Sequence, residues 1–342
     1  MISQKEFEEI ESYLIKSENP LFFFDDDPDG LCSYLLFRKK YEKGKGIPVK
    51  TSHDMYDIYL RKIKEYSPDV VFILDKPILS QEVVDKINIP IIWIDHHEPL
   101  DLKGVKIFNP RIRDKTDSRP VSYWCYRIVR ENMWIGMVGS VGDWFLPEFT
   151  KDFCKQYPDL LDEGVKDPGE ALYENEFGKL SKIFSFALKG NTSDVKKNIN
   201  ILVNIDNPYE ILKQESARGK YIYTQFLKIN RQYEALLERA VKSKTRSKFL
   251  IFTYPSGKMS FTGDLSNELL YKFPNKIVII AREKNESMRL SLRSKNVVLP
   301  PVLLKALEGI DGYGGGHEYA CGANIAKKDF DKFIDKLKEC IK

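Results

Sequence analysis

Short apolar runs separated by polar or helical stretches dominate the first part of the chain. Residues 4–17 are amphipathic and predict an opening helix. Four later runs rich in β-branched and aromatic residues each predict a strand, at 21–24, 70–74, 90–94 and 134–141. The segment after the first run has helical spacing and ends in glycine, as a crossover helix does. This alternation predicts an α/β domain with a buried parallel sheet.

The pattern changes in the middle of the chain. Two long stretches have helical periodicity, at 179–191 and 208–244. The second is long enough to connect two bodies. Strand-like segments then return at 248–255, 276–283 and 288–294. A glycine-rich stretch and a last charged helix end the chain.

These changes predict three parts and a two-lobed α/β architecture. We expect a parallel-sheet N-terminal domain over residues 1–155. A helical linker region would follow over 156–245. A smaller α/β domain would occupy 246–342.

Composition narrows the class of protein. Hydrophobic residues make up 42% of the chain and charged residues 30%, as in globular proteins. No apolar run approaches the roughly 20 residues that cross a bilayer. The acidic, amphipathic N-terminus is unlike a secretory signal, so we expect a cytoplasmic protein with no membrane partner. The five cysteines include no CxxC pair, which favours a reduced protein without a structural zinc site. The net charge of +4 neither demands nor excludes nucleic acid.

Three aspartates follow the first predicted strand. Asp25, Asp27 and Asp29 alternate with other residues directly after the apolar run. A continuing extended backbone would direct these three side chains to one side. Gly30 would then permit a tight turn into the helix.

Acidic residues also end the other three runs. The second run stops at Asp75, the third at Asp95-His96-His97, and the fourth at Asp143. In open parallel sheets, ligands bind at the carboxyl ends of the strands. Four strands that each end in acid would therefore gather their carboxylates at one edge.

Such a cluster favours metal chemistry. Crowded carboxylates repel one another, and divalent cations remove that repulsion. Asp and His ligands without a nearby thiolate suit Mn²⁺ or Mg²⁺. Two cations about 3.5–4 Å apart could hold a bridging hydroxide and clamp a phosphoryl group. A single strand-end Asp is more often a helix cap. Here four apolar runs each end in acid, and two of the chain's four histidines follow one of them, which favours a metal centre. His53 sits in no motif.

The ordered motifs resemble the DHH phosphoesterase superfamily. Asp95-His96-His97 after a hydrophobic strand resembles the signature that names it, preceded by D-x-D-x-D-G and a lone strand-end Asp and followed by Gly-Asp. Near the C-terminus, the GGGH motif at 314–317 and the SLRS segment at 291–294 resemble the DHH-associated domain. The form of the first motif and the length are similar to those of archaeal RecJ-like exonucleases.

The resemblance implies two lobes flanking a cleft, and it implies roles for the acidic cluster. Asp27 and Asp75 would ligate one metal, with Asp25 where many relatives carry His. Asp75 would also ligate the second metal and bridge the two; the other ligands of that metal would be Asp29, His96 and Asp143. His97 would face the substrate phosphate, and Asp95 would orient His96.

The resemblance also implies a phosphate-binding group in the C-terminal domain. Arg293 and His317 would hold the phosphate, since a guanidinium binds phosphate oxygens through two parallel donors. Gly314, Gly315 and Gly316 would let backbone N–H groups approach an anion. With His97 and Asp95, Arg293 and His317 are the predicted catalytic residues.

Two positions depart from the family pattern. Asp25 stands where a His is expected, so one metal site is more acidic. Lys76-Pro77 follows Asp75 where many relatives have a small residue and Gly. Neither change removes a ligand type, so we expect activity.

The resemblance leaves three functions open. The first is an exonuclease that hydrolyses single-stranded DNA or RNA to mononucleotides, with two cations, Mn²⁺ preferred and Mg²⁺ possible. The second is a phosphodiesterase for small substrates, nanoRNA or cyclic dinucleotides. The third is a replication factor associated with GINS and the helicase, although the retained ligands argue against a purely structural role. Trp144, Phe145 and Tyr313 adjoin the motifs and could stack bases, but packing is the favoured role.

Overall fold

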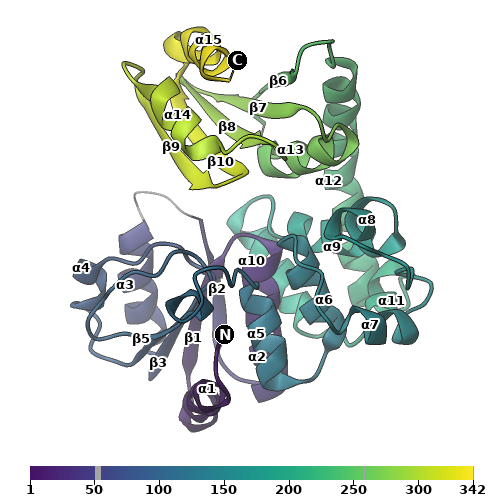
Figure 1. Ribbon diagram of the computed structural model, residues 1–342. Helices are drawn as coiled ribbons and strands as arrows, with labels where there is room; N and C mark the ends of the chain where they lie inside the picture. The colour runs from purple at the N-terminus through teal and green to yellow at the C-terminus, as the bar shows by residue number, and fades with distance from the viewer. Residues whose placement is uncertain (51–54, 258, 342) are drawn as a thin grey trace. The chain divides into compact units, whose positions relative to one another are not determined.

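The computed structural model describes residues 1–50, 55–257 and 259–341, so His53 lies outside the described residues (Figure 1). The chain forms two compact units, Met1–Phe226 and Leu227–Lys342. The division falls inside one long helix, α12 (Ala217–Lys242). The proposed boundaries near residues 155 and 245 remain predictions.

The first unit contains a five-stranded sheet in the order β2-β1-β3-β4-β5, and every pairing in it is parallel. Its strands are β1 (Pro20–Asp25), β2 (Lys45–Val49), β3 (Val70–Leu74), β4 (Ile91–Ile94) and β5 (Lys106–Phe108). This sheet confirms the predicted parallel-sheet α/β fold. The sequence did not predict β2 and β5, because both are short and partly exposed.

Aromatic side chains of β1 pack on both faces of this sheet. The ring of Phe24 stacks on Tyr34 of α2 (Pro28–Tyr41), with 5.2 Å between centroids. Phe23 points the other way and meets Tyr59 of α3 (Met55–Tyr66) edge-on at 4.6 Å. Burying each such ring contributes about 1.5–3 kcal/mol. Burial of both faces explains why β1 is a continuous apolar run rather than an alternating one.

Helices make up most of the remaining first unit. They are α1 (Gln4–Lys16), α4 (Gln81–Val84), a 3-10 turn (Pro110–Ile112), α5 (Val121–Val129), α6 (Met133–Gly142), α7 (Thr150–Gln156), α8 (Pro168–Tyr173), α9 (Glu176–Ala187), α10 (Thr192–Leu202) and α11 (Pro208–Leu212). The helix α1 confirms the predicted opening helix. In the described part of the chain, no helix is both long and apolar enough to cross a membrane.

One predicted strand is wrong. Residues 134–141 belong to the buried helix α6. The run was ambiguous because periodicity cannot distinguish a buried strand from a buried helix. Its glycines recur every third residue, and a Cβ atom at Gly136 or Gly139 would press on Tyr126 or Cys32 at 2.9 or 2.8 Å. This close contact with α5 and α2 is helical packing that the sequence analysis missed.

The predicted long helix over 208–244 is also wrong as a single element. It consists of α11 and α12, separated by residues 213–216. Gln214 in the gap has a φ of 56°, the left-handed conformation that interrupts a helix.

The second unit is built on a mixed five-stranded sheet in the order β6-β7-β8-β10-β9. Only the β6–β7 pairing is parallel. The strands are β6 (Phe249–Pro255), β7 (Ile277–Lys284), β8 (Ser287–Arg293), β9 (Gly312–His317) and β10 (Ala320–Ala326). The helices are α13 (Thr262–Lys272), α14 (Leu299–Leu307) and α15 (Phe330–Cys340), with a 3-10 turn at Lys327–Asp329. The smaller C-terminal α/β domain is confirmed.

One face of this second sheet forms the core of the unit. Leu290 and Leu292 of β8 contribute to this core, and Leu303 of α14 and Phe333 of α15 belong to the same buried cluster. The glycine-rich stretch forms β9 at the edge of the sheet. The motif is therefore held in a hairpin with β10.

We predict that Gly30→Ala destabilises the first unit. Gly30 lies in the first turn of α2, where a Cβ atom would meet the backbone nitrogen and oxygen of Asp25 at 2.6 Å. Close approach, rather than the predicted tight turn, explains this glycine. We expect a loss of about 1–3 kcal/mol in the free energy of unfolding, measured in urea.

Gly263→Ala in α13 is the matched control. A Cβ atom there meets nothing within 4 Å, so the change should be neutral or stabilise by up to about 1 kcal/mol. A Gly30→Ala protein as stable as this control would contradict the packing argument.

Candidate metal centre

The site residues gather where the direction of the first sheet's connections reverses. From β1 the chain goes to β2 on one side and later to β3 on the other, so β1 and β3 flank a switch point. Asp25 is the last residue of β1, and Asp75 directly follows β3. His96 and His97 come shortly after the end of β4. Parallel pairing places these three strand ends at one edge.

Seven side chains form one continuous cluster. Three groups each have potential ligand atoms within 4.8 Å of one another: Asp75, His96 and His97; Asp29, His96 and Asp143; and Asp25, Asp27 and Asp75. Asp75 and His96 each belong to two groups, which joins the three together. The structure thus brings together the six predicted metal ligands and His97.

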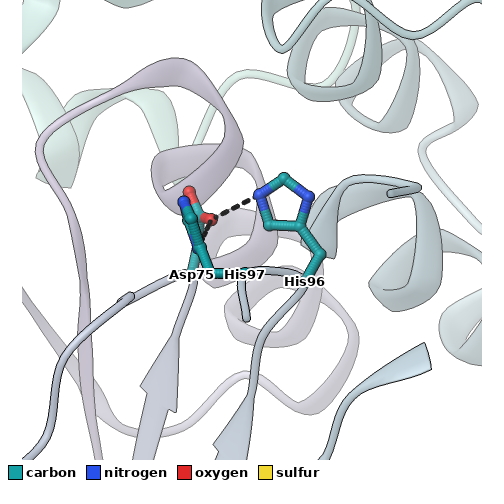
Figure 2. A group of neighbouring side chains, drawn as sticks. All are labelled: Asp75, His96 and His97. Carbon is teal, nitrogen blue, oxygen red and sulfur yellow. Dashed lines mark ion pairs between the residues drawn. The ribbon is translucent and has the colours of Figure 1, made fainter. Parts of the chain in front are cut away.

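Asp75 belongs to two of the three groups and lies beside His96 and His97 (Figure 2). Its backbone has a φ of 56°, which is unfavourable for a residue other than glycine. Its side chain is 2% exposed, and Oδ1 has no hydrogen-bond partner among the described residues. His96 Nε2 lies 3.3 Å from that oxygen and His97 Nδ1 lies 3.9 Å from it. A buried, unsatisfied carboxylate oxygen is costly, and a bound cation would satisfy it. The residues therefore fit a metal centre.

A backbone carbonyl orients His96. Its Nδ1 lies 3.1 Å from the carbonyl oxygen of Ser118. A carbonyl only accepts hydrogen bonds, so Nδ1 carries a proton. In the neutral ring, the lone pair then belongs to Nε2, which lies 3.6 Å from Asp143 Oδ2. This tautomer suits metal binding through Nε2.

Asp95 contacts His97, which corrects the expected pairing of Asp95 with His96. Asp95 Oδ1 lies 2.9 Å from His97 Nδ1, and Oδ2 accepts from the His97 backbone nitrogen at 2.9 Å. Asn109, after β5, donates to the His97 carbonyl at 2.9 Å. Asp95 and Asn109 therefore hold His97 in place, while Ser118 orients His96.

Asp27 and Asp29 also support the first unit structurally. Asp27 is the N-cap of α2 and accepts from the Gly30 nitrogen at 2.9 Å. Asp29 accepts from the backbone nitrogens of Val121 and Ser122, each at 2.8 Å, at the start of α5. The expected extended backbone is therefore wrong, because β1 ends at Asp25 and Asp29 lies in the helix. Its helical position brings Asp29 to the cluster.

Asp143 enters the cluster from the end of a helix. It is the C-cap residue of α6, and its nitrogen donates to the Gly139 carbonyl at 3.1 Å. The cluster thus uses three strand ends, the start of α2 and the end of α6. The prediction that four strand ends meet was wrong for this fourth segment.

Sequence reasoning missed the partner of Asp25. The Lys76 Nζ atom lies 2.6 Å from Asp25 Oδ1 and donates to the Val49 carbonyl at 2.8 Å. The Lys76 side chain is fully buried. The departure from the family pattern at residue 76 was visible, but no local signal in the sequence connected it with Asp25.

The C-terminal motif residues share one face of the second sheet. Ala320 of β10 pairs with Arg293 on one side and with His317 on the other. Directly paired residues point to the same face, so Arg293 and His317 flank Ala320. Arg293 Nε donates to Asn267 Oδ1 at 2.7 Å, which holds the guanidinium. Tyr313, also on β9, is 60% exposed.

Burial and mutual repulsion perturb the acids of the cluster. Burial, followed by neighbouring aspartates, raises the pKa of Asp27 and Asp75 well above the usual range. Burial also raises the pKa of Asp143 to about 6, although His96 opposes it. Burial by itself lowers the pKa of His96, but Asp143 and Asp29 outweigh it and raise this pKa to about 9. Without cations, the cluster therefore retains protons near neutral pH.

We predict that the metal-free protein loses stability as the pH rises from 6 to 9. His96 has a pKa of about 9 when folded and near 6.5 otherwise, so its stabilisation is complete below 6.5 and is lost as the pH rises through 9. The raised pKa of Asp143 also makes the folded protein less stable as the pH rises, but this loss falls between about pH 4 and pH 6.

Thermal unfolding in EDTA across this pH range measures the effect. Excess Mn²⁺ should oppose the trend, because metal ligands bind in their deprotonated forms. His96→Gln should flatten the slope in EDTA. A melting temperature that rises between pH 6 and 9 in EDTA, with the slope unchanged in His96→Gln, would exclude this linkage.

Known proteins share features with both units. Residues 248–342 match the family model of the DHHA1 domain. No curated protein matches the sequence. The chain is similar to Mn²⁺-bound RecJ of Thermus thermophilus, with a TM-score of 0.69 and 14% identity over 98% of this chain and 54% of that one. It thus spans about half the length of that protein. The chain is also similar to a structure of exonuclease RecJ bound to manganese, with a TM-score of 0.64 and 13% identity over 97% of this chain and 92% of that one.

Two other solved structures share the fold. CDC45 from Entamoeba histolytica has a TM-score of 0.59 and 11% identity, covering 98% of both chains. A pGpG-specific phosphodiesterase from Vibrio cholerae has a TM-score of 0.51 and 14% identity, covering 94% of this chain and 99% of its own. At these identities the likeness concerns the fold. Residues 248–342 therefore match the DHHA1 domain family, and the chain as a whole shares the fold of the RecJ structures.

Proposed function

We propose that the protein is a metal-dependent phosphodiesterase, and specifically an exonuclease that releases mononucleotides from single-stranded DNA or RNA. The observation that carries this proposal is the buried, unsatisfied Oδ1 of Asp75. Asp75 belongs to two of the three potential ligand groups, so its carboxylate could serve two cations at once. Paired cations that share a carboxylate are typical of enzymes that hydrolyse phosphate esters.

The proposed ligands divide into two sets. Asp27 and Asp75, with Asp25, would hold one cation, and Asp75 would help hold the other with Asp29, His96 and Asp143. Two divalent cations, with Mn²⁺ preferred and Mg²⁺ possible, would supply an activated water and neutralise the phosphoryl oxygens. Solved RecJ structures contain Mn²⁺ or Mg²⁺, which supports divalent cations of this kind at the centre.

Other residues would bind and orient the substrate. Asp95 and Asn109 hold the His97 ring and backbone, so His97 is placed to contact a phosphate oxygen. In the DHHA1 domain, Arg293 and His317 would bind a phosphate together with the backbone of Gly314, Gly315 and Gly316. A guanidinium fixed through its Nε by Asn267 loses less freedom on binding.

We predict that Asp75→Asn reduces Mn²⁺-dependent cleavage by more than about 100-fold, since even outer-shell changes at metal sites cost 10–100-fold. The assay follows mononucleotide release from single-stranded DNA and RNA labelled at the 5′ or 3′ end. Asp101→Asn is the control, because Asp101 is exposed and lies outside the three ligand groups. If the wild-type protein cleaves no DNA or RNA with Mn²⁺, the proposed function fails.

A second candidate is hydrolysis of small nucleotides. The structural match to the pGpG-specific phosphodiesterase extends over 99% of that protein. A short substrate is therefore compatible with this architecture. We expect kcat/KM for a single strand of about 20 nucleotides to exceed that for a linear dinucleotide. The same enzyme preparation, Mn²⁺ concentration and pH serve for both substrates. Faster cleavage of the dinucleotide would favour this second candidate.

A replication partner is compatible with catalysis. The similarity to CDC45 extends over almost all of both chains, and we include GINS or a related replication protein as a proposed partner. A purely structural role would not require the ligand groups to persist, and here all three remain. Co-purification with GINS subunits would test the partner independently of nuclease activity.

A further inference from the structure

Lys76 is the one fully buried ammonium that contacts the cluster among the described residues. Its Nζ lies 2.6 Å from Asp25 Oδ1. The Val49 carbonyl at the end of β2 accepts a second bond at 2.8 Å. Burying an ammonium is expensive unless it is paired and hydrogen-bonded, so these contacts indicate a built position.

The backbone around Lys76 is also held. Trp93 of β4 is 2% exposed, and its indole nitrogen donates to the Lys76 carbonyl at 3.1 Å. Pro77 follows and restricts the next turn. Both ends of Lys76 are therefore anchored, and the ammonium cannot swing into solvent without breaking buried contacts.

The ammonium affects only one part of the cluster directly. Asp25 belongs to the group with Asp27 and Asp75, so a cation bound there would share the Asp25 carboxylate with Lys76. Among the described residues, no lysine or arginine forms an ion pair with Asp29 or Asp143 in the other group. Each proposed ligand set holds three carboxylates, since Asp75 belongs to both, but only the set of Asp25, Asp27 and Asp75 is in contact with a buried ammonium.

We propose that Lys76 acts as a built-in cation that weakens the Asp25–Asp27–Asp75 site, so that divalent cations fill the centre in sequence, first at Asp29, His96 and Asp143. This inference rests on the proposed metal centre. An ammonium 2.6 Å from Asp25 Oδ1 repels a cation that approaches this carboxylate and competes with it for the same oxygen. The protein would then respond to the free Mn²⁺ concentration through its weaker site, and Lys76 is a positioning residue that sets this response.

Metal titration without substrate tests the proposal. Chelator-treated, dialysed protein is titrated with MnCl₂ in a calorimeter. For the wild-type protein we expect two steps with separate dissociation constants. Lys76→Met removes the charge and keeps an apolar stem, so the weaker step should tighten by about tenfold or more. The stronger step should change much less.

Lys50→Met is the matched control. Lys50 also pairs with an aspartate beside β1, since its Nζ lies 3.1 Å from Asp26 Oδ2, but its side chain is 69% exposed. Lys50→Met removes the same charge as Lys76→Met, but from outside the ligand groups. Because solvent screens exposed charges, the dissociation constants of both steps should stay within about twofold of the wild-type values. Lys76→Arg keeps the charge and should preserve the separation of the two steps.

Two results would overturn the inference in different ways. If the weaker step of folded Lys76→Met is unchanged or weaker, Lys76 does not set the affinity, although the metal centre stands. If the wild-type protein binds no Mn²⁺, the proposed centre itself fails. Circular dichroism verifies folding. If Lys76→Met does not fold, Lys76→Gln, which retains a donor for Val49, replaces it with the same expected result.

Discussion

Repulsion among buried carboxylates is the constraint on which the first unit depends. Five aspartates meet at one edge of the sheet; Asp29 and Asp75 are buried, and the other three are partly buried. The fold limits the repulsion by giving several of them a second partner. Asp27 caps α2, Asp29 binds the start of α5, and Asp25 pairs with Lys76. Helix N-termini and an ammonium thus compensate negative charge before any cation binds.

Asp75 has neither a helix N-terminus nor an ammonium beside it, and only the His96 and His97 rings approach its Oδ1. Its Oδ1 is buried and unsatisfied, and its backbone is in a left-handed conformation. Strain and unmet hydrogen bonds of this kind concentrate at functional sites, where the surrounding structure supports them. Here the parallel strands β1 and β4 pair with β3 on both sides and fix its end. The paired strands therefore hold the strained Asp75 in place at the edge of the sheet, where the proposed cations would share it.

In the second unit, the constraint is to stabilise a glycine-rich edge strand. Its edge strand β9 is rich in glycine, which has little side-chain surface to pack. Pairing with β10 and packing of α14 and α15 against the sheet stabilise it. Pairing of β10 with β8 on one side and with β9 on the other places Arg293 and His317 on one face, because both pair with Ala320. The GGGH motif is therefore part of a paired strand at the edge of the sheet.

The sequence alone determined the parallel-sheet fold, the smaller C-terminal α/β domain and the acids of the candidate site, because apolar runs and the residues that follow them are local features. It misassigned α6, since a short apolar run has no decisive period. Only the tertiary structure decided the partners: Asp95 with His97, Lys76 with Asp25, and Asp29 with the start of α5. The last two contacts join residues 51 and 92 positions apart, and such pairings follow from sheet order and helix packing, which no local pattern encodes.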